Sequence, residues 1–292
     1  MEYCADFAER KYQENLRAKG PELKIGHDHA LANFIEDKII LDHYSPCATL
    51  AFIKEQGLQF DTQLCANTIY NYIYRGDVFL NLTPEHLLYK GERRSPEDKQ
   101  DQDRAREAPG RTIEQRPWEI WARETFGHWE MDSLESGKGF KRTWLMLTER
   151  KTRREIIVPM KDKTSESVVR ALNGIERKLG ALFPRIFVTI TCDNGTEFAR
   201  HTRLRDGPGM DTYFADPYSS RRRGSNENRN GMIRRYLPKR SEIQMGMAGE
   251  LREIVDEADN RPMRVLDYRT PAEAFADELL ELQDQQGCCT SK

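Results

Sequence analysis

The chain has 292 residues, of which 38% are hydrophobic and 32% are charged, and its formal net charge is -2 at pH 7. This composition is typical of a folded protein with one large or two modest domains, and it excludes a chain that is basic throughout. No apolar run of about 18 residues and no signal-peptide pattern occurs, so we expect a cytoplasmic protein that neither spans a membrane nor is secreted. The six cysteines include no Cys-x-x-Cys pair and no zinc-finger spacing, which favours reduced thiols.

Helical periodicity dominates the N-terminal part of the chain. Apolar residues recur at helical spacing within residues 1–29 and stop before Gly20 and Pro21, which predicts one helix followed by a connector. Residues 30–76 contain three shorter segments of the same kind. The last of these is polar and aromatic, and such a helix after two others is typical of a helix-turn-helix that reads DNA. A generic three-helix bundle would show the same pattern.

A charged stretch separates this part from the rest. Residues 77–117 contain a mostly charged segment without periodicity, so we expect a linker there. Residues 118–245 mix strand-like and helical patterns, which predicts an α/β domain. Its expected elements are, in order, strands over 128–134, 143–148 and 155–158, a helix over 164–179, a strand over 186–192, a short strand from 212, and a last helix. Residues 246–292 are predicted to form helices and then an acidic, unstructured tail with Cys288 and Cys289.

The stretch from Asp193 to Glu227 is the most informative part of the α/β domain. Asp193 follows an apolar, β-branched run and precedes the turn signal Asn194-Gly195. An Asp at the carboxyl end of a core strand lies where open α/β sheets bind their ligands. Glu227 is a lone acid within a strongly basic segment, where an ion pair with a neighbouring Arg would explain it equally well. Considered together with Asp193, it favours a metal ligand beside a path for phosphates.

Three carboxylates from different elements suggest a common chemistry. Asp132 on the first strand, Asp193 at the end of the fourth and Glu227 on the last helix can converge on one or two Mg²⁺ ions. Two such ions stabilise the attacking and leaving oxygens of an in-line phosphoryl transfer. Glu130 and Glu197 are competing carboxylates near this site, and Glu130, which shares a strand face with Asp132, is a weaker candidate that would support the metal ligands from behind. His128 is interpreted as a hydrogen-bonding core or rim residue in preference to a metal ligand.

Four motifs resemble the insertion-sequence thirty (IS-thirty) family of DDE transposases: His128–Asp132, Asp193–Phe198, Tyr213–Ser220 and Gly224–Gly231. The similarity extends from about Tyr3 to Phe275. It implies an α/β, ribonuclease-H-like (retroviral-integrase-like) core behind a small all-α helix-turn-helix domain, and a triad of Asp132, Asp193 and Glu227 that binds Mg²⁺, with Mn²⁺ as an alternative. Met131 stands where the family usually has Gly, which predicts a tighter approach to Asp132.

The resemblance also implies which side chains contact DNA. In the basic segment they are Arg221, Arg222, Arg223, Asn226, Arg229, Asn230, Arg234 and Arg235, and in the helical domain Thr68, Tyr70 and Asn71. The arginines could instead form only a solvated face, and the asparagines could cap helices. Tyr70 and Tyr72 could equally be core aromatics of the helical domain.

The resemblance implies a transposase that cleaves DNA at transposon terminal repeats and transfers the strands into target DNA, acting as a homo-oligomer assembled on DNA at the nucleoid. The family's first helix-turn-helix is expected upstream of Tyr3, so we do not expect it in this chain. That expectation motivates an alternative, a non-autonomous DNA-binding fragment that regulates transposition. A ribonuclease-H-type nuclease would use the same carboxylates, but a helical front domain and a linker favour DNA-end recognition.

Overall fold

The computed structural model describes residues 5–18, 23–90, 111–135, 143–192, 195–198, 210–215, 231–233, 236 and 247–289. The chain divides into two compact units, Met1–His86 and Leu87–Lys292, and each is described by itself. Among the described residues, no helix has the length and apolar character needed to cross a membrane.

The first unit is helical. Its elements are α1 (Ala5–Ala18), α2 (His29–Ile40), α3 (Pro46–Glu55), α4 (Ala66–Arg75) and the short η1 (Pro84–His86). The helices α2 and α4 contribute fully buried isoleucines to its core, among them Ile35 and Ile73. The ends of the helices follow their local sequence: Asp28 accepts the N–H of Leu31 at 2.9 Å at the start of α2, and Gly76 ends α4 with a left-handed φ of 69°.

Residues directly after α4 are ordered on this unit, although a linker was expected from residue 77 onward. Phe79 and Leu82 are buried. The carboxylate of Glu36 on α2 accepts the backbone N–H groups of Leu80 at 3.0 Å and Asn81 at 2.9 Å. Two buried apolar side chains and the hydrogen bonds to Glu36 therefore hold this segment on the helical unit, although the composition around residue 90 is mostly charged.

The second unit is built on a six-stranded sheet in the order β1-β6-β5-β2-β3-β4. The strands are β1 (Arg111–Thr112), β2 (His128–Glu135), β3 (Thr143–Glu149), β4 (Glu155–Met160), β5 (Thr189–Cys192) and β6 (Asp211–Phe214). The strands β2, β3 and β4 pair antiparallel, whereas β5, β6 and β1 continue the sheet parallel to β2. The first long strand, β2, lies inside the sheet, with antiparallel strands on one side and parallel strands on the other. This arrangement is ribonuclease-H-like, and the predicted α/β fold class is confirmed.

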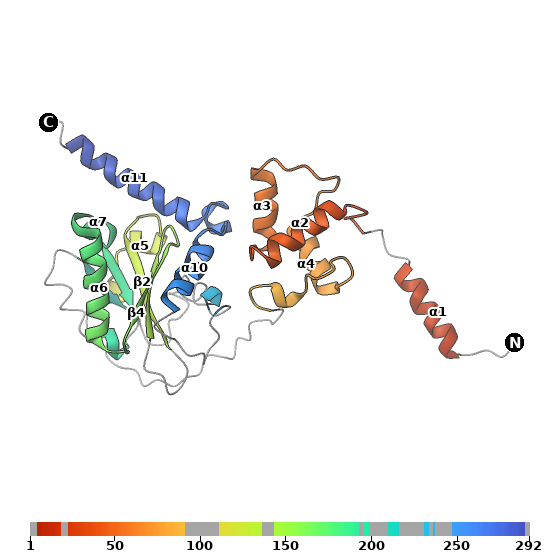
Figure 1. Ribbon diagram of the computed structural model, residues 1–292, viewed down its shortest axis with the longest axis horizontal. Coiled ribbons are helices and arrows are strands. Elements are labelled where there is room, and N and C mark those ends of the chain that lie inside the picture. Colours follow the sequence, from red (N-terminus) through yellow and green to blue (C-terminus); the bar gives the residue numbers. More distant parts are fainter. Residues whose placement is uncertain are drawn as a thin grey trace. The chain divides into compact units, whose positions relative to one another are not determined.

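Helices cover both faces of this sheet (Figure 1). They are α5 (Trp118–Ala122), α6 (Ser165–Leu179), α7 (Phe183–Ile186), α10 (Ala248–Asp259) and α11 (Pro271–Cys289), with short turns η2 (Ile113–Gln115), η3 (Gly180–Leu182), η4 (Thr196–Phe198) and η7 (Arg264–Leu266). Trp129 and Met131 of β2 pack in a core with α6, α7 and α11. Leu134 of the same strand packs instead with Leu251 of α10. Successive side chains of β2 thus serve opposite faces, as the pleat of a strand requires.

Three elements differ from the sequence prediction. The strand expected over 186–192 begins only at Thr189, because Pro184 occupies the first turn of a helical segment, α7. The two-residue strand β1 lies in the segment expected to be linker and pairs with β6. The helix α11 continues through Cys289, where an unstructured tail was expected.

Candidate active site

Asp132 lies on the α10 face of the sheet, in the middle of the central strand. It is half-buried, and its Oδ1 accepts the backbone N–H of Ser133 at 2.8 Å. His128, Glu130 and Leu134 share this face, because side chains at every second position of a strand point the same way. Met131 is buried in the core on the opposite face, so its side chain does not narrow the approach to Asp132.

The other two members of the expected triad, Asp193 and Glu227, lie outside the described residues. The same holds for the basic segment predicted to contact DNA, namely Arg221, Arg222, Arg223, Asn226, Arg229, Asn230, Arg234 and Arg235. Within the parts of the chain that are described, no group of three or more His, Cys, Asp or Glu side chains is arranged to hold a metal ion.

Described residues close in sequence to Asp193 and to Glu227 lie on the same face of the sheet as Asp132. Thr191 on β5 is the register partner of Glu130 on β2. Ile233, six positions after Glu227 in the sequence, is buried in the same cluster as Leu134. The segment that precedes Asp193 therefore pairs with β2, and the segment that follows Glu227 joins the cluster that contains Leu134 of β2.

Glu130 is held in a buried ion pair, although it shares the face of Asp132 as predicted. Its side chain is 0% exposed and accepts a hydrogen bond from Nη1 of Arg150, whose side chain is 1% exposed. Nε and Nη2 of Arg150 donate to the carbonyl oxygen of Ile120 at 3.3 and 3.1 Å. Arg123 approaches the same carboxylate at 4.0 Å. With its carboxylate engaged by Arg150, Glu130 serves as an internal counter-ion.

Glu197 lies on the other side of the sheet from Asp132. Its Oε1 accepts a hydrogen bond from Oγ of Ser133 at 2.7 Å and lies 3.2 Å from Nζ of Lys163. Nζ of Lys163 also contacts Glu135 at 2.5 Å. Burial opposes the charge of Lys163, but its bonds to Glu135 and Glu197 outweigh this effect and raise the pKa of its ammonium. Since Ser133 and Glu135 alternate with Asp132 along β2, the side chains of this network lie on the opposite face of the strand, and it is the backbone N–H of Ser133 that contacts the Asp132 carboxylate.

His128 is the hydrogen-bonding residue that the sequence interpretation favoured. Its Nδ1 lies 2.8 Å from Oγ1 of Thr189 on the neighbouring strand. Burial, with smaller contributions from the nearby charges of Arg150 and Arg116, lowers the pKa of His128 to about 4. The imidazole is therefore neutral at pH 7.

Sequence reasoning missed a set of buried arginines beneath the candidate site. Arg116 is 3% exposed, donates from Nη1 to Oγ1 of Thr191 at 3.0 Å, and lies with its guanidinium carbon 3.9 Å from the ring centroid of Trp121. Arg150 is the second member, in the ion pair with Glu130. A sequence signal for the burial of Arg150 was available, because this residue directly follows the end of an apolar strand.

In the helical unit, the three side chains predicted to contact DNA all lie on α4. Asn71 is exposed, while Thr68 and Tyr70 are half-buried. Burial raises the pKa of Tyr70, with smaller contributions from Cys47 and Tyr74. Tyr72 is buried, so of the two tyrosines that could have been core aromatics it is the one that fills this role.

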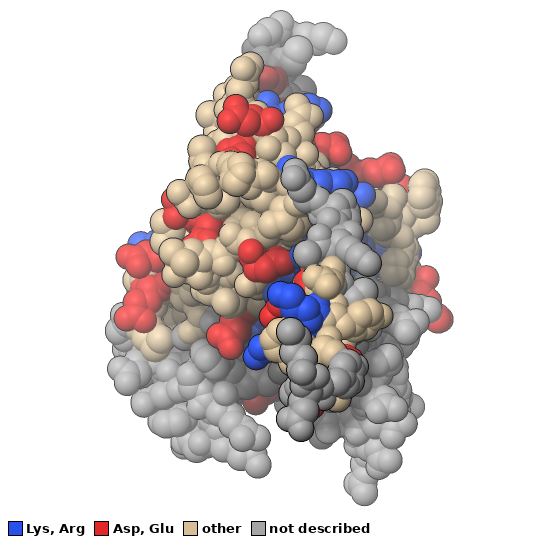
Figure 2. Space-filling model, turned by 90° about the vertical axis from the view of Figure 1, so that its right-hand side faces the viewer, with Lys and Arg blue, Asp and Glu red and all other residues tan. Residues whose placement is uncertain are grey.

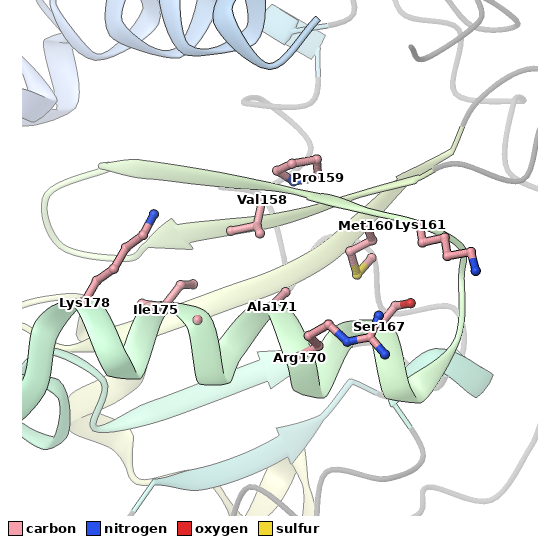
Figure 3. Close-up of a pocket in the computed structure, with 10 residues that line it drawn as sticks. Val158, Pro159, Met160, Lys161, Ser167, Arg170, Ala171, Ile175 and Lys178 are labelled. Atoms are coloured by element: carbon pink, nitrogen blue, oxygen red, sulfur yellow. The ribbon is translucent and has the colours of Figure 1, made fainter. Parts of the chain in front are cut away.

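The surface offers two further observations. On the face shown in Figure 2, acidic and basic side chains of the described residues are interspersed, without one large basic field. A groove of about 280 Å³ lies between β4 and α6 and is lined by Val158, Met160, Ala171, Ile175 and the cations Lys161, Arg170 and Lys178 (Figure 3). It belongs to the α6 side of the sheet and has no carboxylate in its lining, so it is separate from the Asp132 site.

No family model matches the chain, but comparison of its sequence with known proteins identifies relatives. The chain is 31% identical over 287 residues to the transposase of insertion sequence element IS1086 from Cupriavidus metallidurans, covering 97% of this chain and 83% of that protein. It is 37% identical over 164 residues to transposase InsI of IS30A from Escherichia coli, and 32% identical over 212 residues to the probable transposase of IS1161 from Streptococcus salivarius. These two alignments cover 56% and 71% of this chain but only 42% and 57% of the relatives.

Solved structures with a similar fold include the HTLV-2 integrase catalytic core domain in complex with magnesium, at 16% identity and a TM-score of 0.36 over 50% of this chain and 94% of that one. Another is the catalytic core domain of BIV integrase, at 14% identity and a TM-score of 0.40 over 55% of this chain and 99% of that one. The sequence relation is the decisive one, because it exceeds 30% identity over almost the whole chain. The chain therefore belongs to the IS30 family of insertion-sequence transposases.

Proposed function

We propose that this chain is a metal-dependent DDE transposase that cleaves DNA at the ends of an insertion sequence and joins the freed 3′ ends to target DNA. The observation that carries the proposal is the place of Asp132: a half-buried carboxylate on the central strand of a ribonuclease-H-like sheet. Family membership supplies the substrate class, and the sheet supplies a rigid support for the carboxylates.

Asp132, Asp193 and Glu227 are the proposed metal ligands. Thr191 pairs with Glu130, and Asp193 and Asp132 each follow two positions later in the sequence. Two-residue offsets on neighbouring parallel strands preserve both the face and the register, which supports a pairing of the two carboxylates. The burial of Ile233 against Leu134 supports a place for the Glu227 helix on the same face.

The residues present suit a hard divalent cation. The proposed ligands are all carboxylates, and oxygen ligands are the ones that Mg²⁺ prefers, with Mn²⁺ able to replace it. Bound at this site, the metal would activate the attacking water or 3′-hydroxyl and stabilise the charge on the leaving oxygen. The hydrogen bond from the N–H of Ser133 fixes the orientation of Asp132, so the carboxylate is held in place before DNA arrives.

DNA is the proposed partner in both units. Arginines and asparagines of residues 221–235 would contact its backbone, and Thr68, Tyr70 and Asn71 of α4 would contact a terminal repeat. We further propose that the chain assembles as a homo-oligomer on paired ends, in the cytoplasm at the nucleoid.

Cleavage and strand transfer with a labelled terminal-repeat duplex test the proposal. Asp132→Asn should reduce the Mg²⁺-dependent rate by at least about 1000-fold, because it removes a charged metal ligand while preserving the side chain's shape. Asp284→Asn makes the same chemical change at an exposed position of α11 and should leave the rate unchanged. Both variants should bind the duplex equally well in the absence of metal, as measured by fluorescence anisotropy.

Two results would reject the proposal. One is an Asp132→Asn variant that cleaves at the wild-type rate. The other is a wild-type protein that binds the terminal repeat but cleaves with neither Mg²⁺ nor Mn²⁺, which would favour the regulator hypothesis.

A further inference from the structure

Arg116 is a buried cation that has only part of its hydrogen-bonding capacity satisfied. Nη1 donates to Thr191 at 3.0 Å, and the guanidinium lies 3.9 Å from the centroid of the Trp121 ring. Nε and Nη2, which are both buried, have no hydrogen-bond partner among the described residues. The residue itself is 3% exposed, so bulk water does not replace the missing acceptors.

Such an arrangement is unfavourable for folding. Burial, together with repulsion from Arg150 and Arg123 and against the attraction of Glu130, lowers the pKa of Arg116 to about 9. A buried donor without an acceptor destabilises a fold, and an apolar side chain of similar size would avoid that penalty. The nearby Arg150 differs, because each of its three guanidinium nitrogens donates a hydrogen bond, to Glu130 or to Ile120.

The position of Arg116 suggests what offsets this cost. Its acceptor, Thr191, pairs with Glu130, and the proposed metal ligands Asp193 and Asp132 follow these two residues by two positions in the sequence. With a strand rise of about 3.3 Å per residue, an offset of two residues separates the level of Thr191 from the proposed pair of carboxylates by roughly 7 Å along the strands. A cation near the level of Thr191 reduces the repulsion between two carboxylates, and its bond to Thr191 fixes the lateral position of β5.

We infer that Arg116 is a positioning residue for the proposed reaction, retained to hold β5 and the carboxylates above it at the expense of folding stability. This inference rests on the proposed function. It makes a combined prediction that a purely structural arginine would not satisfy: an apolar replacement should preserve or raise stability while it lowers the rate of DNA cleavage.

The test compares two buried arginines in the full-length protein. Arg116→Met should leave the urea midpoint of the metal-free protein unchanged or raise it, whereas Arg150→Met should lower it clearly. All four tryptophans lie between residues 118 and 144, so tryptophan fluorescence reports on the second unit alone. At saturating DNA and Mg²⁺, Arg116→Met should cleave about 10- to 100-fold more slowly, which is the usual effect of a small displacement of reacting groups. Its affinity for the terminal repeat should stay within about twofold of wild type, because Arg116 is shielded from DNA.

Thr191→Val provides an independent variant. It preserves a β-branched side chain in the strand and removes the acceptor of Arg116, so the cleavage rate should fall by about fivefold to tenfold. A Thr191→Val rate equal to wild type would overturn the proposed link between Arg116 and β5.

Three further results overturn the inference. The first is an Arg116→Met variant that unfolds as early as Arg150→Met, which would make Arg116 a structural residue. The second is an Arg116→Met variant that cleaves at the wild-type rate. The third is a wild-type protein without cleavage activity, in which case the proposed function itself fails and the inference with it. Activity of the wild-type protein therefore distinguishes the two failures.

Discussion

The buried pair of Glu130 and Arg150 should dominate the stability of the second unit. Both side chains are almost fully excluded from solvent, at 0% and 1% exposure. Arg150→Met would leave the Glu130 carboxylate inside the protein without its closest cation, while Arg123 lies at 4.0 Å. It would also remove both hydrogen bonds to the carbonyl oxygen of Ile120.

The expected loss follows from the cost of an uncompensated internal charge. Breaking one side of a buried pair destabilises a protein by about 3–5 kcal/mol, and we expect about 4 kcal/mol for Arg150→Met. Glu130→Gln should cost about 3 kcal/mol, because the charge of Arg150 then remains. The double variant removes both charges and should cost only about 4 kcal/mol in total, which corresponds to a coupling of roughly 3 kcal/mol.

Urea unfolding followed by tryptophan fluorescence measures these values for the second unit. With a slope of about 2 kcal/mol per molar urea, Arg150→Met should shift the midpoint by about 2 M. A shift below about 0.5 M would contradict the argument. So would an additive double variant, because it would mean that the two side chains do not interact across the interior.

Two other changes test the packing around the start of β2. Below the unfolded pKa of 6.5, His128 binds a proton in the unfolded chain but not in the folded one, where its pKa is about 4. Stability should therefore fall between pH 6.5 and pH 4, by about 2 kcal/mol after allowance for solvent screening, and His128→Gln should flatten this part of the urea-midpoint profile. Gly127 has a φ of 93°, and an added Cβ would lie 2.7 Å from Cγ2 of Val188. Gly127→Ala should thus lower the free energy of unfolding by about 2–4 kcal/mol. Adding Val188→Ala should restore only the part that is due to the steric clash, because the positive φ remains. A Gly127→Ala variant as stable as wild type would show that the backbone at this position is not strained by a side chain.

Local signals made much of the second unit predictable. The helix expected over 164–179 is present as α6, because Thr164 caps its start and Gly180 follows its end with a positive φ of 54°. The three antiparallel strands were visible from alternating and apolar runs. The two-residue β1 was not, since its pairing with β6 joins positions about one hundred residues apart and leaves no periodic pattern in so short a segment.

The candidate site was predictable only in part, for a related reason. The motif around Asp132 identified the carboxylate and its strand, and the strand period placed Glu130 on the same face. Nothing local indicated that Arg150 would engage Glu130 or that Arg116 would reach Thr191, 75 positions later in the sequence. Both contacts depend on the assembled sheet, in which β5 lies beside β2.

Along the α10 face, β2 and β5 form a series of polar pairs that explains why Asp132 is the proposed metal ligand and its neighbours are not. The first pair, His128 with Thr189, is a buried hydrogen bond between neutral groups. At the second level, the charges of Glu130 and Arg150 compensate each other inside the protein, and Thr191 accepts a hydrogen bond from Arg116. Asp132 follows at the next level and is half-buried. A carboxylate can bind a hydrated divalent ion and a phosphodiester only where water and DNA can enter; the partial exposure of Asp132 allows this, and the full burial of Glu130 prevents it.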